Sequence, residues 1–194
     1  MFGLIKRLKF ALGKEIVRLF FWAEPAILVE NNRRIIAQMK RSGEGLFLNG
    51  RISIVQPEML EVHDNVHIGN NAYIDARGGI VIGANTHISR NFVAHSANHR
   101  YEGNYLPYDE TYEFKPTIIG RNVWIGTNVV VVPGVNIGEG AIIGAGAVVT
   151  QDVPPLAIFG NQRGRVIKYR DKSHYQKLES QKLYSAAKGQ KLHA

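Results

Sequence analysis

Histidine is the side chain of this sequence best suited to move a proton near neutral pH, because its ordinary pKa lies near 6.5. The chain has seven histidines and no cysteine, which excludes disulfides, thiolate metal sites and a cysteine nucleophile. His99 is distinguished by its position. It ends a run of regular repeats and precedes residues 100–116, which are aromatic, acidic and rich in turn-forming residues. Long insertions of this kind are usually functional, so we expect His99 at its root to act as a general base.

The elements that must position His99 repeat every six residues. Six consecutive hexads over 119–154 each open with Ile or Val and carry Val or Ala at the fifth position. Six more cover 62–79 and 82–99, separated by an insertion at Ile80–Val81. A helix repeats at 3.6 and a half-buried strand at 2, so neither explains this period. Short strands joined by Gly- and Asn-containing corners do explain it, with three hexads in each triangular coil and each coil buried on the next.

The sequence therefore predicts an all-β solenoid. Twelve hexads make four coils, and we expect the stretch from Leu46 to Leu60 to add another. Residues 100–116 match no hexad, so they must form a protruding loop. The expected organisation is a basic amphipathic helical segment over 1–45, a β-helix catalytic domain over 46–162 and a basic segment, with a surface helix or tail, over 163–194.

The positive charge of the chain, +8 in all, is concentrated at its two ends. Residues 1–44 hold nine Lys and Arg against four acidic residues and 163–194 hold nine against two, whereas the middle is mildly acidic. The body thus lacks the basic stripe that nucleic acid requires, and no nucleic-acid partner is expected.

The first 22 residues carry apolar side chains at helical spacing, with basic residues between them. These basic residues interrupt any long apolar run, so a signal peptide is not expected. Such a helix can lie on an anionic membrane, or it can pack on the body or on a neighbouring subunit. We expect a cytoplasmic protein that is either free or peripheral on the inner face of the membrane.

Two segments resemble a known family. The segment KPTIIGRNVWIGTNVVVVPGVNIGEGAIIGAGAVVTQDVPP resembles the galactoside, maltose and streptogramin O-acetyltransferases of the hexapeptide-repeat acyltransferase superfamily. The segment SANHRYEG, 96–103, resembles the catalytic histidine segment of the streptogramin branch and of polysaccharide O-acetyltransferases. The resemblance implies a left-handed parallel β-helix, acetyl-CoA as acyl donor, no metal, a homotrimer, and His99 as general base under a loop that covers the neighbouring protomer's site.

The same resemblance implies positions for the acyl donor. The CoA groove would be lined by Thr127, Ala145, Thr150 and Gln151, with Trp124 beside it. Arg165 and Lys168 match basic positions that hold CoA phosphates in the family, and Arg163 is a further candidate. Two departures weaken this correspondence, since Gln151 replaces a frequent lysine and the tail GNQRGRVIKYR lacks the family's Pro and Ala.

The acceptor is expected to be a sugar hydroxyl, in polysaccharide or glycan biosynthesis. The candidate acceptor-binding residues are Asn71, Asp75, His95 and Tyr101. Because the chain has no cysteine and no GxSxG motif, direct transfer in a ternary complex is favoured over an acyl-enzyme.

Rival interpretations remain open. An amino-sugar N-acetyltransferase and an antibiotic O-acetyltransferase would use the same architecture. A γ-type carbonic anhydrase also shares it and binds zinc with three histidines across a subunit boundary, for which His67, His87 and His99 are the candidates. A scaffold without catalytic activity is the remaining alternative.

Overall fold

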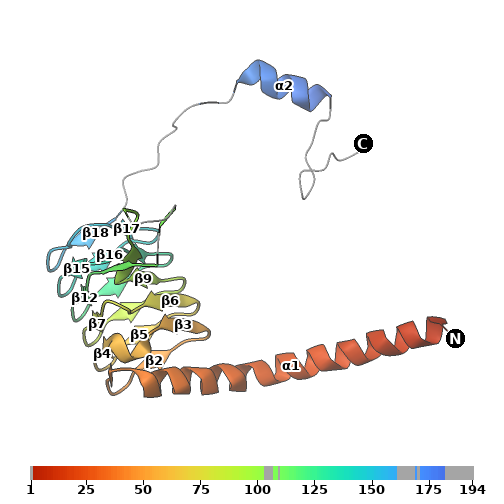
Figure 1. The fold of residues 1–194 in the computed structure, drawn as a ribbon, viewed down its shortest axis with the longest axis horizontal. Coiled ribbons are helices and arrows are strands. Elements are labelled where there is room, and N and C mark those ends of the chain that lie inside the picture. The colour runs from red at the N-terminus through yellow and green to blue at the C-terminus, as the bar shows by residue number, and fades with distance from the viewer. Residues whose placement is uncertain (1, 103–106, 109, 161–168, 170, 182–194) are drawn as a thin grey trace. The chain divides into compact units, whose positions relative to one another are not determined.

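The computed structural model describes residues 2–102, 107–108, 110–160, 169 and 171–181. Contacts divide the chain into two units, Met1–Asn161 and Gln162–Ala194. The first unit holds the long helix α1 (Phe2–Gln38) and a parallel β-helix (Figure 1). The second holds α2 (Lys172–Ser180), which begins at a capping residue, Asp171, whose Oδ1 accepts a hydrogen bond from the backbone of His174 at 2.6 Å.

Three parallel sheets, named A, B and C here, form the walls of the β-helix. Sheet A consists of β1 (Arg41–Ser42), β4 (Leu60–Val62), β7 (Ile80–Ile82), β12 (Thr117–Ile119) and β15 (Asn136–Ile137). Sheet B consists of β2 (Phe47–Leu48), β5 (His67–Ile68), β8 (His87–Ile88), β13 (Trp124–Ile125), β16 (Ile142–Ile143) and β18 (Ile158–Phe159). Sheet C consists of β3 (Ile52–Val55), β6 (Ala72–Asp75), β9 (Val93–His95), β14 (Val130–Val131) and β17 (Val148–Val149). One strand of each sheet makes one coil, so the predicted fold class is confirmed.

Coil length differs along the axis. Leu60 pairs with Ile80, twenty positions on, whereas Ile118 pairs with Asn136, eighteen positions on. The extra residues fall between sheets C and A. There, Ile80 and Val81 are not looped out but belong to β7, and Ile80 is buried. The first coil begins at Arg41, so the stretch Leu46–Leu60 belongs to a coil as expected, and β1 lies inside the segment predicted to be helical.

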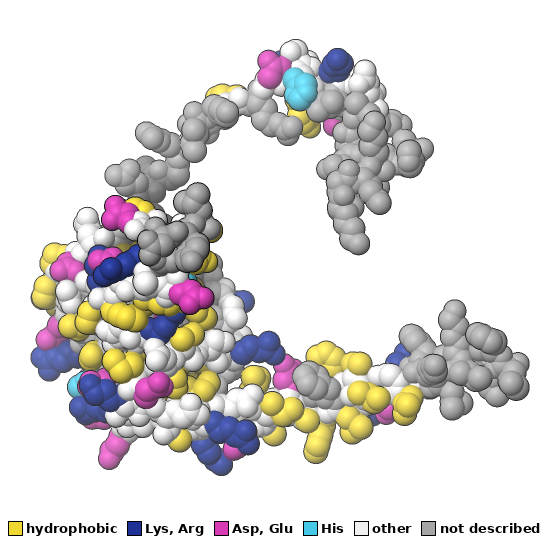
Figure 2. Space-filling model, in the orientation of Figure 1, with side chains coloured by type: hydrophobic (Ala, Val, Ile, Leu, Met, Phe, Trp, Pro, Cys, Tyr) yellow, Lys and Arg dark blue, Asp and Glu magenta, His cyan; other side chains and the backbone are white. Residues whose placement is uncertain are grey.

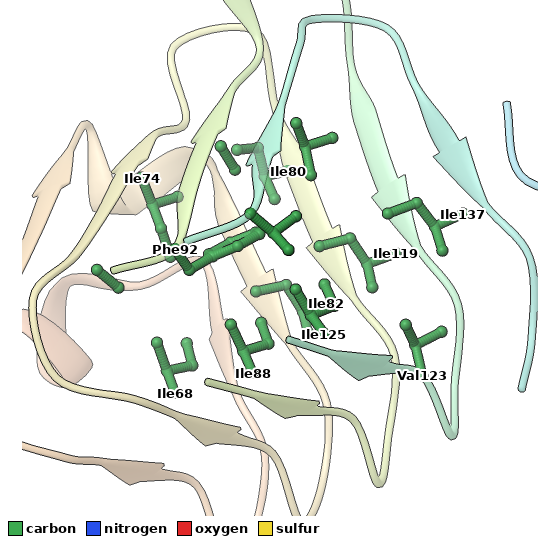
Figure 3. Close-up of a cluster of buried hydrophobic side chains, with 14 of the residues drawn as sticks. Ile68, Ile74, Ile80, Ile82, Ile88, Phe92, Ile119, Val123, Ile125 and Ile137 are labelled. Carbon is green, nitrogen blue, oxygen red and sulfur yellow. The ribbon is translucent and has the colours of Figure 1, made fainter. Parts of the chain in front are cut away.

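The core is a column of branched aliphatic side chains that point into the prism from all three sheets (Figure 3). Ile68, Ile88 and Ile125 form one such column on neighbouring strands of sheet B. The recurring first residue of each hexad is therefore the core residue. Phe92 is the exception at the small fifth position, and its side chain is fully buried. Burial of this apolar surface, at about 25 cal/mol per Å², is the main force that holds the coils together.

Asparagine ladders run along two corners. Asn65, Asn85 and Asn122 are joined by hydrogen bonds from Nδ2 to Oδ1 of 2.9 and 3.1 Å. Asn71, Asn91 and Asn128 form a second ladder with bonds of 3.0 and 2.7 Å. All six residues have φ between 55° and 62°, the left-handed region that Asn tolerates better than other residues with a side chain.

Helix α1 covers the first coil with its last turns. The Asn32 side chain is buried and donates to the carbonyls of Leu48 and Gly50 at 3.2 and 2.8 Å. Met39 joins the core. The end of the solenoid is thereby capped, as stacked-coil folds require.

The earlier turns of α1 carry apolar side chains that face solvent (Figure 2), among them Leu12, Phe21 and Trp22, which are 64%, 66% and 82% exposed. At 100° per residue Phe21 lies opposite Leu12, so the apolar side chains are not confined to one face. None of the described helices has a stretch that is both long and apolar enough to cross a bilayer.

A hairpin interrupts the third coil between sheets C and A. Its strands are β10 (Ala97–His99) and β11 (Tyr112–Phe114), paired antiparallel. The predicted protrusion is present, but it begins at Ala97, so His99 lies on the first strand of the hairpin and does not close a regular hexad. A short 3-10 helix, η1 (Pro57–Met59), occupies the corresponding corner of the first coil.

Candidate active site

The ring of His99 lies between two tyrosines. The centroid of Tyr108 is 4.1 Å away with the ring planes at 24°, and that of Tyr112 is 4.1 Å away at 37°. Two rings cannot both lie this close to the same face without overlapping, so Tyr108 and Tyr112 cover opposite faces of the imidazole. The two tyrosines thereby fix the plane of the His99 ring.

Tyr112 is in turn covered by Arg77, whose guanidinium carbon lies 4.2 Å from the centre of the tyrosine ring. Arg77 reaches this place from the corner that follows β6. Its Nε and Nη2 donate to Oδ1 and Oδ2 of Asp75 at 2.9 and 2.6 Å, a two-pronged ion pair.

The carboxylate of Asp75 is buried, with 2% of its side chain exposed. Burial alone raises the pKa of Asp75, but the hydrogen bonds and charge of Arg77 outweigh it, so the pKa lies below its ordinary value. The same pair raises the pKa of Arg77, chiefly through the hydrogen bond to Asp75. Both groups are therefore charged at neutral pH.

Buried hydroxyl groups hold the root of the hairpin. Ser96 Oγ donates to the backbone carbonyl of Asp75 at 2.8 Å and accepts from the backbone of Gly78 at 2.9 Å. Thr117 Oγ1 donates to the carbonyl of His95 at 2.8 Å. A Cβ at Gly78 would run into the Ser96 carbonyl oxygen, so only glycine allows this close approach. The start of the hairpin is thus fixed to the corner that carries Arg77.

An open pocket of about 400 Å³ lies on the hairpin beside His99. It is lined by Asn98, His99, Arg100, Tyr101, Glu102 and Glu113. Tyr101, a predicted acceptor-binding residue, belongs to this wall and is 78% exposed. The pocket walls are mostly polar, which suits a hydroxyl-rich ligand.

The other predicted acceptor residues separate into two groups. Asp75 and His95 are neighbours in sheet C, with His95 Nδ1 3.8 Å from Asp75 Oδ2. Both lie at the corner that carries the hairpin. Asn71 lies at the opposite end of β6, where it belongs to an asparagine ladder. Within one chain, Asn71 is therefore not close to His99. Both carboxylate oxygens of Asp75 accept hydrogen bonds from Arg77.

Two of the predicted donor residues, Thr127 and Ala145, lie at the corner between sheets B and C. Thr127 and Ala145 occupy the same position in successive coils, joined by a 2.8 Å hydrogen bond from Gly146 N to the carbonyl of Thr127. Ala145 is exposed and a Cβ at Gly146 would meet open space, so the corner has room for a slender chain such as pantetheine. Within one chain, this corner and the hairpin of His99 are separated by the width of sheet C.

The remaining donor candidates are partly outside the described structure. Thr150 and Gln151 are exposed after β17, and Trp124 is 58% exposed on the outer side of sheet B. Arg163, Arg165 and Lys168 lie outside the described residues.

The three histidines of the zinc interpretation are not gathered within one chain. His67 and His87 are register partners in sheet B, with ring centroids 5.7 Å apart, whereas His99 lies on the hairpin. Over the residues that the structure describes, no group of three His, Cys, Asp or Glu is arranged to hold a metal ion. The Nε2 of His67 is buried without a hydrogen-bond partner, and burial and the neighbouring His87 lower the pKa of His67.

Sequence reasoning missed Arg77, Tyr108 and Tyr112 as individual site residues. Two signals were available. Arg77 stands in IDARGG, a hexad with Gly at the fifth position, directly before the two-residue insertion, and both tyrosines belong to the aromatic insertion. Their meeting at His99 depends on how the hairpin returns, which a hexad pattern does not encode.

Comparisons with known proteins agree with the repeat and the fold. The family model "Bacterial transferase hexapeptide (six repeats)" matches residues 116–151, and "Hexapeptide repeat of succinyl-transferase" matches residues 61–93. The comparison with curated proteins finds no match. A maltose O-acetyltransferase from Clostridium difficile is 27% identical, with a TM-score of 0.62 over 82% of this chain and 84% of its own.

Two further solved structures share the fold. A hexapeptide-repeat acetyltransferase from Vibrio cholerae, complexed with acetyl coenzyme A, is 25% identical, with a TM-score of 0.63 over 72% of this chain and 76% of its own. An N-acyltransferase from Bacillus cereus, in complex with dTDP-4-amino-4,6-dideoxyglucose and coenzyme A, is 20% identical, with a TM-score of 0.56 over 78% and 93%, a likeness in fold alone. The hexads, the coils and these relatives agree: the chain carries transferase hexapeptide repeats over 61–93 and 116–151 and is similar in sequence and fold to hexapeptide-repeat acetyltransferases.

Proposed function

We propose that this acyltransferase moves an acetyl group from acetyl-CoA to a sugar hydroxyl in glycan or polysaccharide biosynthesis, with His99 as general base. The observation that carries the proposal is the His99 ring, which is stacked between Tyr108 and Tyr112 beside a polar pocket. The likeness to a maltose O-acetyltransferase and to an acetyltransferase complexed with acetyl-CoA supports the donor and the acceptor class.

The chemistry follows from what each partner needs. An alkoxide is not accessible at neutral pH, so a hydroxyl attacking a thioester must lose its proton as the new C–O bond forms. The neutral His99 imidazole accepts that proton. As the tetrahedral intermediate collapses, the C–S bond breaks and the imidazolium returns the proton to the CoA thiolate. Atoms and charge balance without an acyl-enzyme or a metal.

Geometry favours a site completed by a second copy of the chain. The donor corner of Thr127 and Ala145 and the hairpin of His99 lie on different edges of sheet C, so one chain alone does not bring thioester and base together. We therefore propose that the protein is a homotrimer in which the hairpin of one copy faces the donor corner of the next.

Activity measurements test the reaction. Release of free CoA from acetyl-CoA is followed against a panel of neutral sugars, amino sugars and oligosaccharides. His99→Ala should lower kcat/KM for a hydroxyl acceptor by about 10²- to 10⁴-fold, whereas His63→Ala, on another corner of the solenoid, should leave it unchanged. Turnover with amines alone would favour N-acetylation, and an active His99→Ala would refute the assignment of the base.

Mixing inactive variants tests the shared site. Ala145→Trp should block the donor corner and His99→Ala should remove the base, so each homotrimer is inactive. After unfolding and refolding together in equal amounts, about a quarter of the interfaces would pair an intact hairpin with an intact corner and regain activity. A mixture that stays as inactive as its components would contradict a shared site.

A second proposal concerns the exposed part of α1. Phe21 and Trp22 face solvent on the side of α1 that also carries Lys14 and Arg18, which are exposed. Apolar side chains next to basic ones favour binding to an anionic membrane surface. We propose that this part of α1 contacts such a surface, which would suit work on a lipid-linked saccharide.

A further inference from the structure

We infer that Arg77 is a positioning residue for the proposed base, acting on His99 through Tyr112. The inference rests on the proposed function, because it concerns the orientation of the group that we assign as the base. Arg77 itself does not line the pocket beside His99. Its role would therefore be exerted through the rings between them.

Four side chains form one continuous stack. Arg77 lies 4.2 Å and His99 lies 4.1 Å from the centroid of Tyr112, and two groups this close must cover opposite faces of that ring. Tyr108 then covers the far face of His99. The order along the stack is Arg77, Tyr112, His99 and Tyr108, so the guanidinium closes the end nearest the solenoid.

The solenoid end of this stack is held rigidly. Asp75 binds both prongs of the guanidinium, and its own backbone carbonyl accepts from Ser96 Oγ at 2.8 Å. Asp75 lies in β6, whose residues pair with β3 on one side and β9 on the other. The position of Arg77 is therefore set by the β-helix and not by the hairpin.

The hairpin end has less support of its own. β10 and β11 pair only with each other, over three residue pairs, and a two-stranded hairpin has little stability by itself. The planar guanidinium above Tyr112 supplies both a cation–π contact and a flat packing surface. Arg77 thus ties the orientation of the His99 ring to the rigid solenoid.

Catalysis is sensitive to such an orientation. A misplacement of about 1 Å in a reacting group can lower the rate by about 10²-fold. Loss of the guanidinium should therefore lower kcat while leaving the KM for acetyl-CoA close to wild type, because the donor corner is on another edge of the solenoid. A general loss of folding would instead lower the amount of active enzyme without changing how the His99 ring is oriented.

The test compares Arg77→Gln and Arg77→Lys with a matched control, Arg121→Gln. Arg121 also forms an ion pair with an acidic residue, Glu139 at 2.7 Å, but on an exposed corner away from the hairpin. We expect Arg77→Gln to lower kcat by about 10- to 100-fold. Arg77→Lys should not restore kcat, because lysine keeps the positive charge but lacks the planar guanidinium. Arg121→Gln should match wild type.

A spectroscopic readout separates this inference from the proposed function. Ring protons of His99, stacked between two tyrosines, should show low-frequency ring-current shifts in the proton–carbon NMR spectrum, with the signal assigned through His99→Gln. In Arg77→Gln these shifts should diminish, and Arg77→Lys, which keeps both tyrosine rings, should give the same change if Arg77→Gln folds poorly. Unchanged His99 signals and unchanged kcat in a folded Arg77→Gln enzyme would overturn the inference.

The two failures are distinguishable. Wild-type enzyme that consumes no acetyl-CoA with any acceptor would refute the proposed function, while the ring-current shifts would still report whether Arg77 orients His99. Active wild-type enzyme with a folded, fully active Arg77→Gln variant would refute only the positioning role.

Discussion

Asn85 donates a hydrogen bond from its Nδ2 to Oδ1 of Asn122 at 3.1 Å, although the two residues are 37 positions apart and the whole β10–β11 hairpin lies between them. The same ladder joins Asn65 to Asn85 across an ordinary coil at 2.9 Å. The insertion therefore leaves the register of the solenoid intact. The hairpin that carries His99 is thus attached to a support that continues in register past it.

The ladder predicts an order of stability among variants of Asn85. Asn85→Ala loses a donor and an acceptor and places an alanine at φ 58°, which together should lower the free energy of unfolding by about 2 kcal/mol. Asn85→Gly loses the same hydrogen bonds but relieves the backbone, so it should cost less than Asn85→Ala. Urea unfolding measures both. Equal losses in the two variants would show that backbone strain does not contribute.

Glycines in the coils serve different needs, which gives a second prediction. Gly146 occupies the position in the next coil that Asn128 occupies in its own coil, at the end of the second asparagine ladder. Its φ is 73°, and a Cβ there would meet nothing within 4 Å. Gly146→Asn should therefore be neutral or stabilise the fold by up to about 1 kcal/mol, because Asn accepts this φ and restricts the unfolded chain. Thermal and urea unfolding would check it, and a loss of 2 kcal/mol or more would contradict the ladder geometry.

Gly83 provides the contrasting case for that experiment. A Cβ at Gly83 would lie 2.5 Å from the backbone nitrogen of Arg121. The backbone of a stacked coil cannot shift easily to relieve this clash. Gly83→Ala should cost about 1–3 kcal/mol. Comparing the stability of the two variants distinguishes Gly146, which is present for its positive φ, from Gly83, which is required because there is no space for a side chain.

The period of six predicted the coils well because each hexad contributes one buried aliphatic residue, and that requirement is local and repeated. Ile119, Ile125 and Ile137 are all core residues for this reason. The period could not predict the stack at His99, since Arg77 and Tyr112 belong to irregular segments 35 positions apart. The period also could not show what Asn71, a predicted acceptor-binding residue, contacts: its side chain forms part of an asparagine ladder at the corner between sheets B and C, and its role in acceptor binding stays a prediction.

The pH dependence of stability should report on His67. Burial and His87 lower the pKa of folded His67 below the unfolded value near 6.5. The unfolded chain therefore binds the proton more readily, so the stability linked to His67 is fully present above pH 6.5 and is lost as the pH falls through the lower folded pKa. His67→Phe should show a smaller loss of stability between about pH 7 and pH 5.5 than wild type. Urea unfolding at a series of pH values measures the difference, and parallel curves for the two proteins would refute it.

The exposed turns of α1 give the last prediction, which is made in the full chain. Wild-type protein should bind vesicles of phosphatidylcholine and phosphatidylglycerol more tightly than vesicles of phosphatidylcholine alone, because Lys14 and Arg18 add attraction to anionic lipid. Reversing both charges, Lys14→Glu with Arg18→Glu, should remove the preference. Trp22→Ser should weaken binding to both vesicles, because Trp22 is 82% exposed and contributes apolar contact. Deletion of residues 1–22 should abolish binding while the cap formed by Asn32 and Met39 remains. Binding that survives the deletion would refute the membrane proposal, as would a wild-type protein that binds neither vesicle.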